Sequence, residues 1–259
     1  MTHLLGMLGR RTLRAAVYLI DLIVFTLLAM REWRRHSRLL DRATYESTIT
    51  QIIFTGVDGL PTVTLLGVVV GVGITTHLLF LGDALGDTRD VVDVLTQVVG
   101  LQLGSLLTAF ALIGRSGAAI AVDLGNMKLN REVEGLELLG ISINHFLVTP
   151  RLFGTCISQL VLSVYLTVLA LVSGVSFAGL LFSPGYTDFL AEIPGAFDPL
   201  DLLAFVAKNL VFGLIIGAAA CFHGLRVEDA VTEVPQQVQR AIANSLVLIL
   251  LLNGILAVP

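Results

Sequence analysis

The sequence predicts an all-α membrane protein. We expect an N-terminal helix along the membrane surface, five transmembrane helices, and a short cytoplasmic helix between the second and third spans. Hydrophobic residues make up 55% of the 259 residues and charged residues only 14%, too few to cover a soluble protein of this length. The mean hydropathy is +0.88. Five apolar runs are long enough to cross a hydrocarbon core of about 30 Å, which takes roughly 20 helical residues.

The first fifty residues contain an apolar run that is too short to span. Residues 15–30 are apolar apart from Asp21 and would form a helix of about 24 Å. Arginines flank the run on both sides, which favours a helix lying on the cytoplasmic face. A cleavable signal peptide is the alternative, but no small-x-small cleavage pattern follows Met30. We therefore expect a membrane-associated region over 1–52 and a transmembrane domain over 53–259.

Five apolar runs follow, and each predicts one span. Small residues recur at four-residue spacing inside them, as in Gly67 with Gly71 and Gly213 with Gly217, which lets helix backbones approach closely in lipid. For any single pair, the general tolerance of apolar helices for glycine explains the pattern equally well. The expected spans are 57–81, 94–113, 152–182, 202–222 and 238–258.

The distribution of Lys and Arg predicts the orientation. Basic residues gather before the first span, between the second and third, and between the fourth and fifth, whereas the other two connections hold only Arg89. Cytoplasmic segments carry the excess of basic residues in membrane proteins. The N-terminus is therefore expected in the cytoplasm and the C-terminus on the outer side.

The polar segment 114–151 between the second and third spans predicts one short amphipathic helix. Apolar positions recur every three to four residues, charged positions fall on other faces, and Gly140 is a C-cap candidate. Such a helix, tethered by two spans, can receive mechanical work from a soluble partner. The apolar positions are Leu129, Val133, Leu136 and Leu139, and the charged ones are Arg131, Glu132, Glu134 and Glu137.

Several kinds of chemistry find no support in the sequence. No Gly-rich loop followed by Lys-Ser or Lys-Thr is present, so any ATP would bind to another subunit. No cluster of His, Cys and carboxylates has metal-ligand spacing, and Cys156 and Cys221 lie inside apolar runs as small core residues. An intramembrane lipid-modifying enzyme or a secondary transporter are the alternative functions. Each needs a cluster of ionisable residues well inside the spans, where Lys208 and His77 are available and Gln102 adds only an uncharged amide.

Three polar residues near the spans have two interpretations each. Lys208 lies about 10 Å into the fourth span, so it either faces a polar cavity or extends its ammonium outward. Gln102 either bonds to another helix or lines a cavity. Arg115 is eight residues from Asp123, about 12 Å along a helix, so the two are not a direct pair. Arg115 either anchors the helix end or only contributes to the basic cytoplasmic side.

Several motifs have a specific pattern: GRSGAA (114–119), DLG (123–125), Met127, the acidic helix and LVTPR (147–151), with KNLVFG (208–213) in the fourth span. In these motifs the chain resembles the MlaE (YrbE) permease family, the membrane subunits of ABC transporters that work with MCE-domain proteins. The resemblance extends from about residue 53 to the end.

Four features depart from the family pattern. An Arg-Glu pair usual in the family, facing the lipid pathway, is replaced by Leu101 and Gln102, and the acidic residue before Leu-Gly is Asp123 instead of Glu. The family's Gly-rich lead into the last span is replaced by VEDAVTEVPQQVQRA (227–241), and an Asp within that span by Asn253. These changes concern substrate binding more than architecture.

The resemblance implies a permease subunit without a catalytic centre, metal or cofactor of its own. Two copies, expected as a homodimer, would form the membrane core. Two ATPase subunits carrying ATP and Mg would dock on the cytoplasmic side, and an MCE-domain protein on the outer side. The cargo would be a phospholipid or a similarly hydrophobic molecule, and no nucleic acid is involved. The expected location is a bacterial inner membrane, in preference to a plastid envelope.

The residue pattern and the family resemblance together predict roles for individual residues. Coupling to the ATPase is assigned to Arg131, Glu132, Glu134, Leu136, Glu137 and Leu139. Structural anchors are Arg115, Asp123, Pro150 and Arg151, and the lipid pathway would include Gln102 and Lys208.

Overall fold

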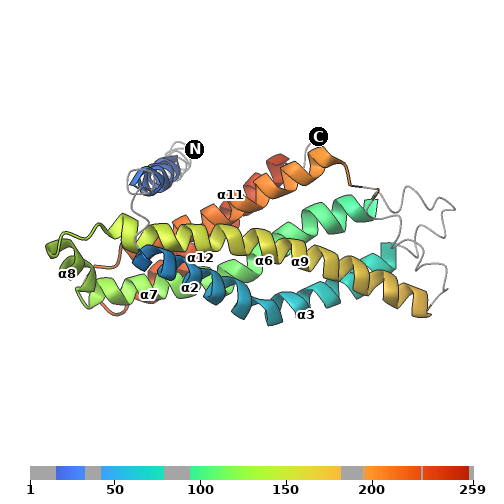
Figure 1. The fold of residues 1–259 in the computed structure, drawn as a ribbon, viewed down its shortest axis with the longest axis horizontal. Helices are drawn as coiled ribbons and strands as arrows, with labels where there is room; N and C mark the ends of the chain where they lie inside the picture. Colours follow the sequence, from blue (N-terminus) through green and yellow to red (C-terminus); the bar gives the residue numbers. More distant parts are fainter. Residues whose placement is uncertain are drawn as a thin grey trace, which may run out of the picture.

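Five long helices lie side by side in an elongated bundle (Figure 1). The computed structural model describes residues 16–32, 42–78, 94–181, 195, 197–228 and 230–256, and within these ranges there is no strand. All five helices are long and apolar enough to cross a membrane, which confirms the predicted all-α membrane fold. Their bounds are Tyr45–Leu78, Thr96–Leu129, Asn144–Leu181, Pro199–Gly224 and Glu233–Leu256.

Each span is found where a span was predicted, but the first three helices extend well beyond the apolar runs. The first contains α2 (Arg42–Gly56) and α3 (Leu60–Val70). Helix α2 continues through residues 52 and 53, where the sequence analysis divides the chain into two regions. The division itself stays a prediction. The second contains α6 (Gly104–Leu112) and α7 (Ala118–Leu129). The third contains α9 (Thr149–Leu181), and the last two are α11 (Pro199–Gly224) and α12 (Glu233–Leu256).

The second helix includes two stretches of π-helix, where backbone hydrogen bonds skip one residue more than in an α-helix. They are Thr96–Leu103, before α6, and Ile113–Gly117, between α6 and α7. Single π-turns within α-helices are uncommon and frequent at functional sites. The helix axis nevertheless continues over all 34 residues from Thr96 to Leu129.

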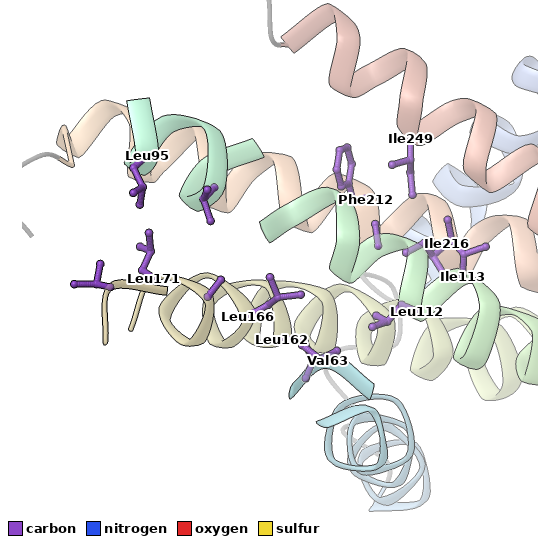
Figure 2. Packing of buried hydrophobic residues seen from close by; sticks show 14 of the residues in the cluster. Val63, Leu95, Leu112, Ile113, Leu162, Leu166, Leu171, Phe212, Ile216 and Ile249 are labelled. Carbon is purple, nitrogen blue, oxygen red and sulfur yellow. The ribbon is translucent and has the colours of Figure 1, made fainter. Parts of the chain in front are cut away.

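Helix α9 lies at the centre of the bundle and contacts α2, α3, α6 and α11. Figure 2 shows Leu162 and Leu166 of α9 packed near Leu112 of α6, with Phe212 and Ile216 of α11 alongside. Small residues make the helix contacts close. A Cβ at Gly213 would lie 2.5 Å from Cα of Cys156, and one at Gly71 would collide with the carbonyl of Ala170. The close approach predicted from glycine spacing is therefore confirmed at these two crossings.

A short connection closes one end of the bundle, and we call this end the α8 end. It comprises residues 130–143 and contains α8 (Glu132–Leu138), which stands beyond the long helices (Figure 1). A second buried cluster fills this end, formed by residues such as Ile120 and Leu124 of α7, Val133 of α8 and Ala219 of α11.

The N-terminal helix, residues 16–32, touches the α8 end at both of its own ends. Tyr18 stacks on His223 in the last turn of α11, with ring centroids 5.5 Å apart, and Asp21 pairs with Arg226 at 3.4 Å. At the other end, Ser142 donates to Glu32 at 3.2 Å. The helix therefore runs across the bundle instead of along it (Figure 1), and its location on a membrane face stays a prediction.

His223 joins this helix to both of the last two spans. The Asn244 amide donates to Nε2 of His223 at 3.0 Å, so Nδ1 carries the ring proton and donates to Gln237 at 3.0 Å. The Tyr18 hydroxyl lies 3.3 Å from Nε2. Burial raises the pKa of Tyr18, which keeps the phenol protonated as a donor.

Candidate functional site

The predicted amphipathic helix is shorter than expected. Leu129 was assigned to its apolar stripe but is the last residue of α7, which continues the second span. The reason is packing: Ile120 and Leu124 are buried where α7 contacts α11 and α12, so the helix runs on past the apolar run that ends at residue 113. Only the seven residues of α8 remain as a separate helix.

Two backbone features hold α8 at a sharp angle to α7. Arg131 has φ +60°, the left-handed conformation that non-glycine residues rarely adopt, and it turns the chain between the helices. Gly140, with φ +73°, follows the other end. Its N–H donates to the carbonyl of Glu137 at 2.9 Å, and Ile141 donates to Leu136 at 3.0 Å, the Schellman pattern. The prediction of Gly140 as a C-cap is confirmed.

Side-chain contacts reinforce this turn. Lys128, on the last turn of α7, pairs with Glu134 at 3.4 Å, and the amide of Asn130 donates to Glu132 at 3.5 Å. Both pairs are exposed, so each contributes at most about 1 kcal/mol. Their effect is to orient the acidic face of α8 and not to stabilise the fold.

The helix α8 buries one side and exposes the other. Val133 is 2% exposed and Leu136 is half-buried against the cluster at this end. In contrast, Leu138 is 90% exposed and Leu139 is 77% exposed, in a segment that projects beyond the long helices. Arg131, Glu132, Glu134 and Glu137 are all exposed around them. Sequence reasoning missed Leu138, although the Leu-Leu pair directly before the capping glycine was a usable signal.

Two charged residues of the second span, Arg115 and Asp123, anchor it to different neighbours. Arg115 lies 3.8 Å from Asp58 of the first span and its guanidinium lies 5.8 Å from the ring centroid of Phe54. Asp123 instead forms an ion pair with Arg151 of the third span. Arg115 and Asp123 are thus not partners, as the helical spacing predicted.

Arg151 and Pro150 lie in the first turn of α9. Arg151 also donates to the carbonyl of Leu147 at 2.9 Å, so its guanidinium joins the start of the third span to α7. Pro150 is buried and follows a π-helical turn, Asn144–Val148. Because proline has no N–H, the irregular turn before it loses no hydrogen bond at that position.

Lys208 does not extend its ammonium outward, one of the two arrangements expected from the sequence; that it faces a polar cavity stays a prediction. It is only 7% exposed, and its ammonium donates to the Leu101 carbonyl at 2.7 Å and to the Gln102 side chain at 3.0 Å. Both acceptors lie in the π-helical stretch of the second span, whose irregular bonding makes a carbonyl accessible. In the family resemblance described above, Leu101 and Gln102 replace the usual Arg-Glu pair.

A buried polar network extends from this lysine across three spans. Ser105 Oγ donates to the same Leu101 carbonyl at 3.1 Å and accepts from Asn209 at 2.9 Å. Asn209 accepts from Gln159 of α9 at 3.1 Å. Asn209 and Gln159 are both 0% exposed. The sequence analysis did not single out either residue, although an amide inside an apolar run was the available signal.

The described residues hold no group of three or more His, Cys, Asp and Glu side chains that could bind a metal. Both cysteines are free; Cys221 is buried and Cys156 is partly exposed. The arrangement consists of an exposed helix at one end and a buried polar network between spans.

Comparison with known proteins places the chain in a family. The family model described as Permease MlaE matches residues 48–258. The chain is 24% identical over 213 residues to the chloroplastic protein TRIGALACTOSYLDIACYLGLYCEROL 1 of Arabidopsis thaliana, covering 82% of this chain but only 61% of that relative. It is 24% identical to a probable ABC transporter permease protein of Rickettsia bellii, covering 95% of this chain and 93% of the relative.

A third relative is a probable ABC transporter permease protein of Synechocystis, 27% identical over 172 residues, which are 66% of this chain and 65% of the relative. The match to the family model includes the second span, the α8 connection and the fourth span with Lys208. This chain, a multi-pass membrane protein with five candidate spans, belongs to the MlaE permease family.

Proposed function

We propose that this protein is the permease subunit of an ATP-driven transporter that moves phospholipid, or a related hydrophobic lipid, between membranes. Membership in the MlaE permease family and the relatives named as ABC transporter permeases support a transporter subunit and not an enzyme. The observation that carries the proposal is α8, a short helix that projects from the bundle with Leu138 at its end and Leu139 directly after it both exposed.

The α8 end is proposed to face the cytoplasm and to receive an ATPase subunit. Large apolar side chains exposed outside a bilayer mark interaction sites, and Leu138 and Leu139 lie beyond the spans. The surrounding acidic side chains and Arg131 would form the polar rim that such interfaces carry. ATP and Mg²⁺ would be bound by the ATPase, because this chain has no phosphate-binding loop.

The buried polar network is proposed to border the lipid pathway. Lys208 and Gln102 lie nearer the end of the bundle opposite α8, which the basic residues predict to face outward. We further propose two permease copies as a homodimer, two ATPase subunits, and an MCE-domain protein on the outer side. A bacterial inner membrane is the proposed location; the chloroplastic relative keeps a plastid envelope as the alternative.

The test replaces the two exposed leucines of α8. Leu138→Gln with Leu139→Gln should lower the amount of co-purifying ATPase by more than about tenfold, because fully burying a leucine side chain is favourable by about 1.5–3 kcal/mol and both variants lose that term. Co-purification from native membranes, with bound lipid analysed by mass spectrometry, measures both partner and cargo.

Val231→Gln is the matched control, because Val231 is also exposed at this end but lies on the connection between α11 and α12. It should leave ATPase binding unchanged. Equal ATPase recovery from the double variant and the control would contradict α8 as the docking site, and the absence of any lipid in the purified complex would contradict the cargo.

A further inference from the structure

A cavity of about 280 Å³ lies between the N-terminal helix, α9 and α11. Its walls are almost entirely apolar, with Leu152, Phe153 and Ile157 on one side and Leu210 and Leu214 on the other. The only hydroxyl in the lining belongs to Thr149, and it already donates to the Asn144 carbonyl at 2.8 Å. The Cys156 thiol in the lining likewise donates to the Leu210 carbonyl at 3.5 Å, so the cavity leaves no side-chain donor free for a polar ligand.

The cavity follows from the close contact of two helices. Gly213 brings α11 against the backbone of α9 at Cys156, so the larger side chains on either side stand above the crossing and leave a cleft between them. The N-terminal helix covers part of this cleft with Ala29, which is fully buried, and Met30, which is half-exposed. Ile157 and Val211 at the rim are also exposed, so the cleft opens to the surroundings of the bundle.

The depth of the cavity restricts what can enter it. Its walls on α9 and α11 belong to membrane-spanning helices, and Leu214 is ten residues, about 15 Å, from the end of α11 at the α8 end. Water needs two or more polar partners to occupy a cavity, and the lining leaves no side-chain donor free for it. At this depth the surrounding medium is hydrocarbon, so the fitting occupant is an acyl chain.

We propose that this cavity binds one acyl chain of a phospholipid from the leaflet at the α8 end, and that the bound chain holds the N-terminal helix against α9 and α11. The exposed Arg31, next to Met30 on the same helix, provides a positive charge for the lipid phosphate at the mouth. This lipid is a fixed component of the permease. Its binding does not depend on the proposed transport activity.

The test uses the purified permease alone in nanodiscs that contain a small fraction of phospholipid with a diazirine at the end of one acyl chain. After irradiation, peptide mapping by mass spectrometry should find adducts concentrated on the cavity walls. Ile157→Trp fills the cavity from the rim and should lower this labelling several-fold. Met30→Trp fills it from the N-terminal helix and should do the same, which guards against a local effect of one substitution on α9.

Val161→Trp is the matched control, one turn along α9 from Ile157 and exposed outside the cavity; it should leave the labelling unchanged. Labelling spread evenly over the exposed face of α9, or unaffected by both filling variants, would overturn the proposal. Arg31→Gln should reduce labelling by a phospholipid probe about fivefold and spare a diacylglycerol probe, which lacks the phosphate; equal loss of both would overturn the role given to Arg31. No ATPase is present, so these outcomes are separate from those of the docking test.

Discussion

Polar side chains are arranged in opposite ways at the α8 end and in the interior of the bundle. On α8 the acidic residues point outward, beside two exposed leucines, and two of them accept exposed hydrogen bonds, from Lys128 at 3.4 Å and from Asn130 at 3.5 Å. Between the second, third and fourth spans, the amides of Gln159 and Asn209 are fully buried and bond to each other. The side chains of the first region can still bond to a partner protein, whereas most hydrogen-bonding groups of the second region already bond to each other.

This difference shows what each region is built to do. Exposed ion pairs contribute little to stability, so α8 can be altered without unfolding the bundle. Buried polar groups lose much more when a partner is removed, because the remaining group has no water to replace it. Substitutions on α8 should therefore change assembly and leave stability intact, and substitutions in the network should do the reverse.

The largest expected effect is on partner binding. Glu134→Lys with Glu137→Lys should reduce co-purifying ATPase on the order of a hundredfold, because reversed charges meet a surface complementary to acidic residues. The protein should remain in the membrane with an unchanged thermal midpoint. Glu228→Lys, an exposed carboxylate at the same end outside α8, is the control and should bind normally. If the double variant lost thermal stability as well as ATPase binding, α8 would contribute to folding, which would contradict the difference proposed between the two regions.

A smaller effect is expected on stability from the network. Asn209→Leu removes its hydrogen bonds with Gln159 and Ser105 and should destabilise the protein by about 2 kcal/mol. The measurement is the midpoint of heat-induced aggregation in detergent. The control is Asn126→Leu on an exposed position of α7, which should shift the midpoint little. Equal midpoints for the two variants would mean that the network carries no net stability.

The smallest effect is expected beside the lysine. Gln102→Leu removes one of the two acceptors of the Lys208 ammonium and should cost about 1.5 kcal/mol, since the Leu101 carbonyl remains. Gln102→Glu keeps an acceptor oxygen and should not lower the midpoint of heat-induced aggregation. If Gln102→Leu proves as stable as the natural protein, the ammonium must reach another acceptor.

The sequence predicted those features that depend on local pattern. The five spans are present in the expected order, because apolar runs of this length have few alternatives to crossing a membrane. Gly140 ends α8 as expected, since the left-handed conformation after a helix favours glycine. Leu129 was misassigned because the end of an apolar run was taken as the end of the helix, whereas α7 continues on packing alone.

For features that depend on how helices align, the sequence can point to candidate residues but not to their contacts. Arg115 pairs with Asp58, 57 positions earlier, only because the irregular turn Val57–Gly59 lies at the height of Arg115 in the bundle. The network of Gln159 and Asn209 likewise requires the register between α9 and α11. Leu138 was overlooked because its exposure depends on the angle that Arg131 imposes on α8.

The π-turn at Ile113–Gly117 divides the second span into two parts that can rotate relative to each other. It separates α6, which carries Ser105 of the polar network, from α7, which carries the turn to α8. Converting such a turn to α-helical bonding shifts the register by one residue, which rotates everything beyond it by about 100°. A rotation of α7 can thus be accommodated at this π-turn, while α6 keeps its contacts with the neighbouring spans.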